Sequence, residues 1–217
     1  MGNYQLLNVA VGKPKVMQYA GNQEMSTAIK KQSTEEVLLK VDGFDGDGVA
    51  DLKHHGGVER AVCFYADERY EYWNNTYDNS LDKAAFGENL TVKGMLEEEV
   101  CIGDIYQIGE AVVTITQGRV PCNTIDRSTG LKGLFKQMIE TGYTGYFAKV
   151  VKEGMIRPDS SIQLKERGKH RISVLQANRL FFQQIKDLNQ MELLLQQEVL
   201  AEKWRSHFER LAAKFNS

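Results

Sequence analysis

Cysteine is scarce in this sequence, and its scarcity limits what kind of protein the chain can be. Three cysteines occur in 217 residues, at positions 63, 101 and 122, and none of their spacings is CxxC. Three thiols cannot form a complete disulfide framework. Structural zinc sites and iron–sulfur clusters need grouped ligands that are missing here. We therefore expect a reduced, cytoplasmic protein.

Long apolar runs and a surplus of one charge are also missing. No apolar run approaches the ~20 residues of a spanning helix, and the start, MGNYQLLNVAVGK, lacks the order of a signal peptide. Lys and Arg total 27 against 29 Asp and Glu, which leaves a formal net charge of −2. Nucleic acids and membrane surfaces attract strongly basic proteins. We expect no membrane association and no direct nucleic-acid binding.

Short β-like runs separated by glycine turns dominate the region up to residue 166. Each run is rich in Val, Ile, Tyr and Phe and alternates in part, as strands do. The runs are YQLLNVAV (4–11), RAVCFYA (60–66), EVCIGDIYQIG (99–109), EAVVTITQ (110–117), GYFAKVV (145–151) and SIQLKE (161–166). Many short strands with few helices favour a mainly β domain over residues 1–166, a closed or nearly closed β-barrel.

Two helical segments are predicted within this β region. ADERYEYWNNTY (66–77) places Tyr70 and Trp73 on one face. LKGLFKQMIETG (131–142) carries five apolar residues at helical spacing and ends at Gly142, a residue type that commonly closes helices. We expect both segments to flank the barrel.

Glycine and proline disappear from Ser173 onward, and the pattern becomes helical. Ser173 followed by Gln176, and Asn189 followed by Glu192, are both typical of a capping box at the start of a helix. The last segment carries a single apolar stripe at helical spacing. We predict three short helices that form a separable all-α unit over residues 169–217.

The segment VDGFDGDGVADLKHHGG (41–57) is acidic and rich in glycine. A calcium loop beginning at Asp45 would place Gly56 where a glutamate ligand is required, so calcium is not expected. His55 is followed by Gly56 and Gly57, and two such glycines allow backbone N–H groups to turn toward an anion. A plain turn explains the same pattern.

Cys122 differs from the other two cysteines because it lies in a polar break, QGRVPCNTI (117–125), rather than in an apolar run. Pro121 stiffens the backbone before the thiol. Arg119, three residues away, supplies the positive charge that favours a thiolate. From these residues alone, Cys122 is either a functional thiol or an ordinary loop residue.

Four stretches occur together in one order, and their combination is more specific than any one of them. They are GDGVADLKHHGGVERAVCFYADERYEYW, FGENLTVKG, VCIGDIYQIGEAVVTITQGRVPC and TGYTGYFAKV. Together they resemble the MOSC domain, the C-terminal domain of molybdenum cofactor sulfurases. The whole chain resembles the bacterial YiiM-like subgroup, which carries a three-helix C-terminal extension. The resemblance implies a β-barrel that binds a mononuclear molybdenum–pterin cofactor.

The resemblance also implies roles for single residues. Cys122 would be the catalytic residue and the protein ligand of molybdenum, which suits a soft thiolate. Arg119 and Lys31 would bind the phosphate of the cofactor. The other matching cofactor-binding positions are His55, Gly56, Gly57 and Asn89. Asn89 taken alone fits a turn cap equally well, and Thr124 stands where many relatives carry lysine.

The implied activity is reduction of small N-hydroxylated compounds, for example hydroxylaminopurines to amines, by oxygen-atom transfer. Flavin, haem and iron–sulfur signatures are missing, so an external reductase would supply the electrons; pyridoxal phosphate is not expected either. Two alternatives stay open. Cys122 would carry a persulfide in a sulfurtransferase, or the protein would be a non-catalytic carrier of the molybdenum cofactor.

Overall fold

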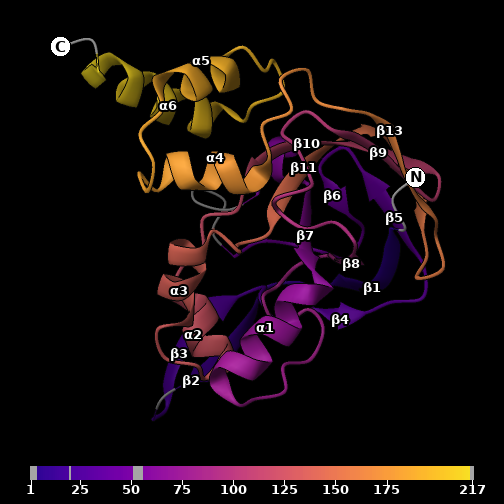
Figure 1. The fold of residues 1–217 in the computed structure, drawn as a ribbon. Helices are drawn as coiled ribbons and strands as arrows, with labels where there is room; N and C mark the ends of the chain where they lie inside the picture. The colour runs from indigo at the N-terminus through magenta and orange to yellow at the C-terminus, as the bar shows by residue number, and fades with distance from the viewer. Residues whose placement is uncertain (1–3, 20, 51–55, 216–217) are drawn as a thin grey trace.

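The fold is described from a computed structural model, which describes residues 4–19, 21–50 and 56–215. The strands are β1 (Gln5–Val11), β2 (Lys15–Tyr19), β3 (Gln23–Thr27), β4 (Gln32–Ser33), β5 (Val37–Lys40), β6 (Gly43–Phe44), β7 (Val62–Ala66), β8 (Leu90–Lys93), β9 (Ile105–Ile108), β10 (Ala111–Gly118), β11 (Tyr146–Lys152), β12 (Gly154–Ile156) and β13 (Ile162–Glu166). The helices are η1 (Val58–Arg60), α1 (Asp67–Tyr77), α2 (Thr124–Thr129), α3 (Leu134–Thr141), α4 (Val174–Phe181), α5 (Leu188–Leu195) and α6 (Glu202–Phe215). The last three helices lie together beside one end of the β structure (Figure 1).

Eight strands form the main sheet, in the order β13-β9-β10-β11-β7-β8-β1-β4. The pairing is antiparallel except between β7 and β8, which are parallel. Register shifts interrupt the pairing of β1 with β8, β10 with β11 and β9 with β13. Such bulges bend a sheet, and this one curls into a half-barrel whose edge strands, among the described residues, do not pair with each other. The predicted class, mainly β with a C-terminal three-helix part, is confirmed.

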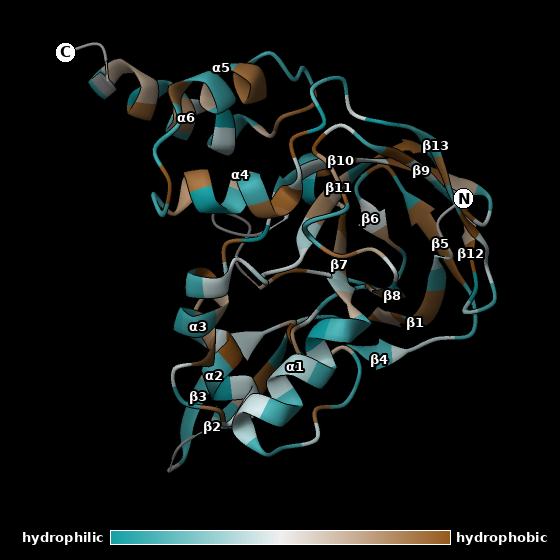
Figure 2. Cartoon of the chain, viewed as in Figure 1, coloured by the Kyte–Doolittle hydropathy of each residue, from teal (hydrophilic) through white to brown (hydrophobic). Residues whose placement is uncertain are grey.

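The central strand β7 is buried on both faces. All five of its residues are buried, and its alternate side chains enter two different apolar clusters. Val62 and Phe64 pack inside the half-barrel, whereas Tyr65 packs with Trp73 of α1 and residues of α2 and α3. A strand covered on both faces is largely apolar rather than alternating, and the strand labelled β7 in Figure 2 is drawn in light to brown shades.

The predicted strands agree with the structure to within one or two residues, except over 99–109. Only β9, Ile105–Ile108, is a strand there, and the preceding residues form turns. The buried carboxylate of Asp104 explains the difference, because it accepts hydrogen bonds from Cys101 N at 3.0 Å and from Gly168 N at 2.8 Å. These bonds hold the chain in a turn despite its β-like composition.

Both helices predicted in the β region are present, and one α-helix and the short 3-10 helix η1 were missed. The left-handed Gly142 closes α3, and its N–H donates to Met138 O, as predicted. The missed α-helix, α2, begins two residues after Cys122. It is short, and the carboxylate of Asp126 ties it to the start of α3 through Gly133 N and Phe135 N.

The C-terminal helices agree with the prediction in number but not in every start. The capping box of Ser173 and Gln176 is present in full. The second predicted cap is wrong: α5 begins at Leu188, and its N-cap is Asp187, whose side chain accepts from Gln190 N at 3.0 Å. Asp187 takes this role because its own backbone is extended, while Asn189 already lies inside the helix.

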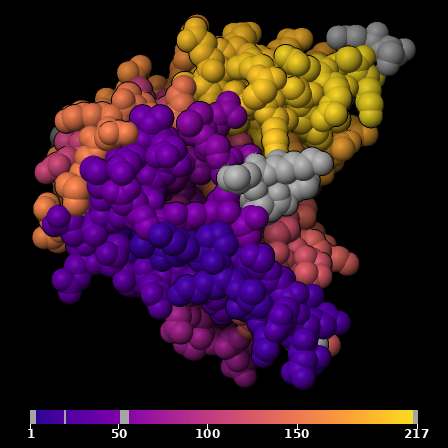
Figure 3. All heavy atoms as spheres, turned by 180° about the vertical axis from the view of Figure 1, so that it is seen from behind, coloured from indigo at the N-terminus to yellow at the C-terminus, as the bar shows by residue number. Residues whose placement is uncertain are grey.

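Side chains of the C-terminal helices belong to the same apolar cluster as those of the half-barrel. Leu180, Trp204 and Phe208 are buried in one cluster with Ile115 and Tyr146 of the sheet. Figure 3 shows the C-terminal segment, in yellow, directly against the body of the protein. The independence of the two parts stays a prediction, and this shared core argues against it. None of the helices in the described part of the chain has the length and apolar content of a transmembrane span.

Candidate functional site

Five strands bring predicted site residues from distant parts of the chain to one region. One row of paired residues crosses the sheet through Gly118, Tyr146, Phe64, Leu90 and Val9. Arg119 directly follows the last residue of β10, and Asn89 directly precedes the first residue of β8. The sheet topology therefore places the two motifs that contain Arg119 and Asn89 on either side of β7.

Asp47 joins two of the predicted cofactor-binding residues. Its Oδ2 accepts a hydrogen bond from Asn89 Nδ2 at 2.8 Å, and its Oδ1 is paired with Lys31 Nζ. Oδ1 also accepts from Gly12 N at 2.8 Å. The Lys31 side chain is only 6% exposed and that of Asp47 15%, so water screens this ion pair weakly. The sequence did not single out Asp47, because an acid within a glycine-rich turn looks like an ordinary turn residue.

Asn89 uses its whole side-chain amide on protein partners. Besides Asp47, its Nδ2 donates to Ala10 O at 3.2 Å, and its Oδ1 accepts from Cys63 N at 3.1 Å. It is 4% exposed. Asn89 thus holds together the end of β1, the middle of β7 and the loop that carries Asp47. A direct contact between Asn89 and a cofactor stays a prediction.

The backbone N–H of Arg119 is hydrogen-bonded, but one nitrogen of its guanidinium has no partner among the described residues. Its N–H donates to Gly145 O at 3.0 Å, while its Nη1 is buried and has no hydrogen-bond partner among the described residues. Its charge acts to lower the pKa of both Cys63 and Tyr65, which places the guanidinium near β7. A buried donor without an acceptor is costly, so this is the place where an anionic group fits best.

The three cysteines lie in different environments. Burial raises the pKa of Cys63 to about 11, so its thiol stays protonated at neutral pH. Burial also raises the pKa of Cys101. Cys122 is partly exposed, and its carbonyl accepts from Ile125 N at 3.1 Å at the entry to α2. Of the three, Cys122 is the thiol that can meet a ligand.

The segment of Lys31 and the helix after Cys122 are neighbours. Lys30 Nζ donates to Ser128 O, in α2, at 3.0 Å, and the guanidinium of Arg127 lies over the Tyr19 ring at 4.8 Å. The end of α2, the helix that follows Cys122, therefore lies against the segment that carries Lys31.

The structure describes the two glycines after His55, while His55 itself lies outside the described residues. Gly56 and Gly57 both have positive φ, 81° and 94°, a region that favours glycine. A Cβ on Gly56 would lie 2.9 Å from Val49 Cγ2, whereas Gly57 faces open space. Gly56 thus packs on the loop that carries Asp47, and a ligand contact by either glycine stays a prediction.

Glu88, in the same motif as Asn89, is a buried residue that the sequence did not single out. It is 0% exposed, and its Oε1 accepts from Tyr70 Oη at 2.5 Å and from Thr91 Oγ1 at 2.8 Å. Burial and the nearby Glu88 carboxylate raise the pKa of Tyr70. Oε2 of Glu88 has no hydrogen-bond partner among the described residues.

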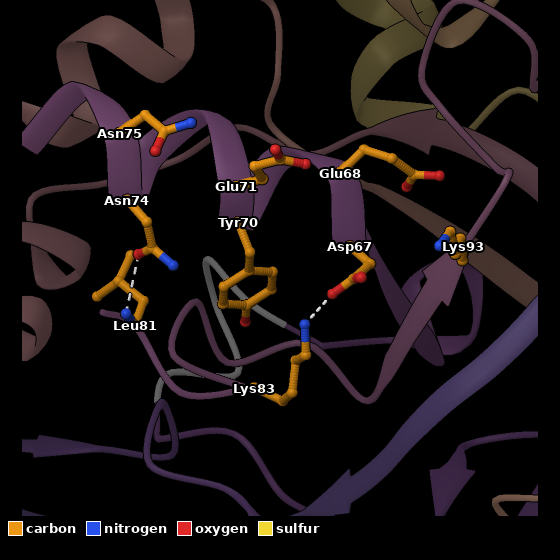
Figure 4. A pocket seen from close by; sticks show the side chains of 9 residues that line it. All are labelled: Asp67, Glu68, Tyr70, Glu71, Asn74, Asn75, Leu81, Lys83 and Lys93. Atoms are coloured by element: carbon orange, nitrogen blue, oxygen red, sulfur yellow. Dashed lines mark hydrogen bonds and ion pairs between the residues drawn. The ribbon is translucent and has the colours of Figure 1, made fainter. Parts of the chain in front are cut away.

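A separate pocket of about 410 Å³ lies along α1. Figure 4 shows Asp67 and Lys83 pointing toward each other across it, with Tyr70 between α1 and the opposite loop. Its lining carries both charges and includes none of the predicted site residues. We do not assign the predicted chemistry to this pocket.

The surroundings of Arg119 have one feature that fits an anionic organic cofactor. Within the described ranges, no group of three or more His, Cys, Asp or Glu residues is placed to hold a metal ion. A single thiolate is a weak site unless further ligands come from elsewhere. The unpartnered Nη1 of Arg119 suits the anionic end of such a cofactor.

Comparison with known proteins places the chain in a family. It belongs to the MOSC domain family, which matches residues 51–163. The YiiM-like, 3-alpha helix domain matches residues 172–215. These matches confirm the resemblance that the motifs indicated, for the β region and for the C-terminal helices.

Similar proteins extend over nearly the whole chain. YflK of Bacillus subtilis is 40% identical over 205 residues, which cover 94% of this chain and 93% of YflK. A protein named reductase in Gibberella moniliformis is 36% identical over 180 residues, 81% of this chain but 32% of that longer protein. The crystal structure of YiiM from Geobacillus stearothermophilus superposes with a TM-score of 0.81 at 29% identity, covering 96% of this chain and 99% of that one.

Proposed function

We propose that this protein is a molybdenum-cofactor-dependent reductase that converts small N-hydroxylated compounds, such as hydroxylaminopurines, to amines. Membership of the MOSC family supports a molybdenum cofactor, and the name of the fungal relative supports reduction. The observation that carries the proposal is the buried, unpartnered Nη1 of Arg119. It lies in the loop that also presents the partly exposed Cys122.

Different residues of the site would bind different parts of the cofactor. Cys122 Sγ would be the protein ligand of the metal, and Arg119 would bind the phosphate. The ammonium of Lys31 has three N–H donors; the contact with Asp47 uses one, and the others would serve the same anion. Asp47 and Asn89 keep Lys31 in place and connect it to β7.

The bound cofactor would supply the two-electron chemistry that removes the hydroxyl oxygen. The overall change, R–NHOH to R–NH2 and water, consumes two electrons and two protons. A separate reductase would supply the electrons, because the chain carries no second redox group of its own in its sequence motifs. Cys63 would take no part, since its pKa of about 11 keeps it a neutral thiol.

Elemental analysis of the natively purified protein tests the cofactor first. We expect near-stoichiometric molybdenum together with phosphorus, both strongly reduced in Cys122→Ala. Cys101→Ala is the matched control, because Cys101 is a buried thiol in another part of the fold. Labile sulfur on Cys122 without molybdenum would instead support the sulfurtransferase.

A turnover assay then tests the substrate class. Hydroxylaminopurine is supplied with a chemical reductant, and formation of the amine is followed by chromatography. We expect turnover in the parent and in Cys101→Ala but none in Cys122→Ala. If the loaded protein transfers its cofactor to an apo-enzyme but never forms the amine, the protein is a cofactor carrier and the reductase proposal is wrong.

A further inference from the structure

The C-terminal helices touch the backbone of the residue immediately before Arg119. A Cβ placed on Gly118 would lie 1.8 Å from Asn178 Oδ1, in α4, and 3.0 Å from Trp204 Cη2, in α6. No side chain fits in that space, so the side chains of Asn178 and Trp204 pack directly against the backbone of β10. Figure 1 shows α4 beside β10 and β11.

Asn178 also starts a chain of hydrogen bonds that ends at Arg119. Its Nδ2 donates to Thr144 Oγ1 at 3.0 Å, and that hydroxyl donates to Gly145 O at 3.0 Å. The same carbonyl accepts the N–H of Arg119 at 3.0 Å. The hydrogen bonds form an unbroken relay from α4, through the turn before β11, to the loop that carries Arg119 and Cys122.

The side chains of this relay are buried, so they have few alternative hydrogen-bond partners. Asn178 and Thr144 are both 0% exposed, so water does not replace a lost bond. Asn178 Nδ2 makes a second bond to Gly142 O at 2.8 Å, which fixes its amide in one orientation. In a low-dielectric interior the first two bonds reinforce each other, because the Thr144 hydroxyl accepts in one and donates in the other; Gly145 O then holds the Thr144 hydroxyl and the Arg119 N–H together.

A second contact ties the same helical unit to the other side of the loop. Gln184, just after α4, donates through Nε2 to Ile139 O at 2.6 Å and Glu140 O at 3.0 Å, at the end of α3. Helix α3 shares an apolar cluster with Ile125 of α2. The Arg119–Cys122 loop is therefore held by β10 on one side and by α2 and α3 on the other, and the C-terminal helices contact both supports.

We propose that the C-terminal helical unit is part of the scaffold of the candidate site, with Asn178 and Thr144 as positioning residues for Arg119. The relay fixes the Arg119 backbone and so aims its guanidinium at the anion. In naming a cofactor phosphate as that anion, the inference rests on the proposed function. It replaces the idea of a separable tail with a tail that the site needs.

Thr144→Val tests the relay with little change of shape, because only the hydroxyl is lost. Amide hydrogen exchange of the full chain as purified, read on peptides over 117–125, should become roughly three- to tenfold faster, the effect of one net hydrogen bond. Thr144→Ser retains the hydroxyl and should restore exchange close to the parent rate. Asn178→Ala should give a similar increase, and combining it with Thr144→Val should add little, because both break one relay.

Leu194→Ala is the control for general loss of stability. Leu194 is 0% exposed in α5 and belongs to the shared core, but it makes no contact in the relay. We expect it to lower the melting temperature at least as much as Thr144→Val while exchange over 117–125 stays near the parent rate. Unchanged exchange in Thr144→Val, or an equal increase in Leu194→Ala, would overturn the inference.

Molybdenum content after dialysis is the second measurement. We expect Thr144→Val to lose molybdenum several-fold faster than both the parent and Leu194→Ala. If exchange rises but molybdenum is retained as in the parent, the positioning of Arg119 for the cofactor is wrong. A parent that contains no molybdenum would overturn the proposed function, while hydrogen exchange would still decide the relay.

Discussion

Asn89 and Asp47 are 42 positions apart in the chain, yet their side chains are joined by a hydrogen bond of 2.8 Å. This bond connects the motif FGENLTVKG to the acidic loop, two segments that the sequence presents as unrelated. Through the other oxygen of Asp47 the connection reaches Lys31. Two of the predicted cofactor-binding residues, Lys31 and Asn89, thus belong to one network of side chains.

Asp47→Ala should destabilise the protein, because it leaves the ammonium of Lys31 buried without its counter-ion. Removing one partner of a buried pair costs about 3–5 kcal/mol, and the partial exposure of Asp47 places the expected loss near the lower end, about 3 kcal/mol. Urea unfolding measures it. The double variant Asp47→Ala with Lys31→Met should recover part of the loss. If Asp47→Ala unfolds at the parent urea concentration, the ion pair is not a buried one.

Arg119→Ala should weaken cofactor retention more than Lys31→Ala. Arg119 has a donor without a protein partner, whereas Lys31 is already paired with Asp47. Loss of a charge-assisted hydrogen bond amounts to about 1.5–3 kcal/mol, roughly a ten- to hundredfold faster loss of molybdenum during dialysis. Arg119→Lys is the control, because it preserves the charge but not the planar fork. Full retention of molybdenum in Arg119→Ala would refute the phosphate assignment.

Thiol labelling should separate Cys122 from the other two cysteines. Reaction with iodoacetamide at pH 8, followed by peptide mass spectrometry, should modify the partly exposed Cys122 first. Cys63 and Cys101 should react only after unfolding, because burial hides them and raises the pKa of both thiols. Bound cofactor should protect Cys122. Equal labelling of all three thiols in the folded protein would contradict the assigned environments.

Cys122→Ala and Cys63→Ala should have opposite effects. Cys122→Ala should abolish reduction with little change in melting temperature, because a partly exposed loop thiol contributes little packing. Cys63→Ala leaves a small cavity beside β7 and should cost about 1 kcal/mol or more, while reduction continues. Activity of Cys122→Ala near the parent level would end the thiolate-ligand mechanism.

Alkaline pH should reveal the buried thiol of Cys63. Its folded pKa of about 11 lies above the ordinary value of 9.0, so the folded state holds this proton more tightly. The resulting stability is complete below pH 9 and is lost as the pH rises through 11. Two pKa units correspond to about 2.7 kcal/mol. The difference in unfolding free energy between parent and Cys63→Ala should fall by most of this amount, about 2 kcal/mol, from pH 8 to 11, and a constant difference would show that the thiol is not buried as described.

Gly118→Ala should destabilise the contact between the sheet and the C-terminal helices. The added methyl group collides with Asn178 Oδ1, and overpacking of this kind costs about 1–3 kcal/mol. The double variant Gly118→Ala with Asn178→Ala removes the colliding atom and should recover part of the loss in urea unfolding. Additive effects of the two changes would mean that the residues do not meet.

Part of the candidate site could be predicted from the sequence, because some residues reveal their environment through their immediate neighbours. The contrast between Cys122 in a polar break and Cys63 in an apolar run is local, and the structure agrees with it. Glu88 lay within a quoted motif, but nothing local distinguishes a buried carboxylate from an exposed one. Asp104 shows the same limit, since its hydrogen bonds turned a β-like run into a turn.

The sequence by itself determined the mainly β class, the family, the three C-terminal helices and the cap at Ser173. The class, the helices and the cap depend on periodicity or on contacts between residues three or four positions apart, and the family depends on four motifs in one order. A linear pattern records all of these. Only the tertiary structure decided the partner of Lys31 and the support of Arg119 by α4. Those contacts join residues 16 to 42 positions apart, such as Asn178 and Thr144 at 34. They exist because sheet pairing and a shared core bring the segments together.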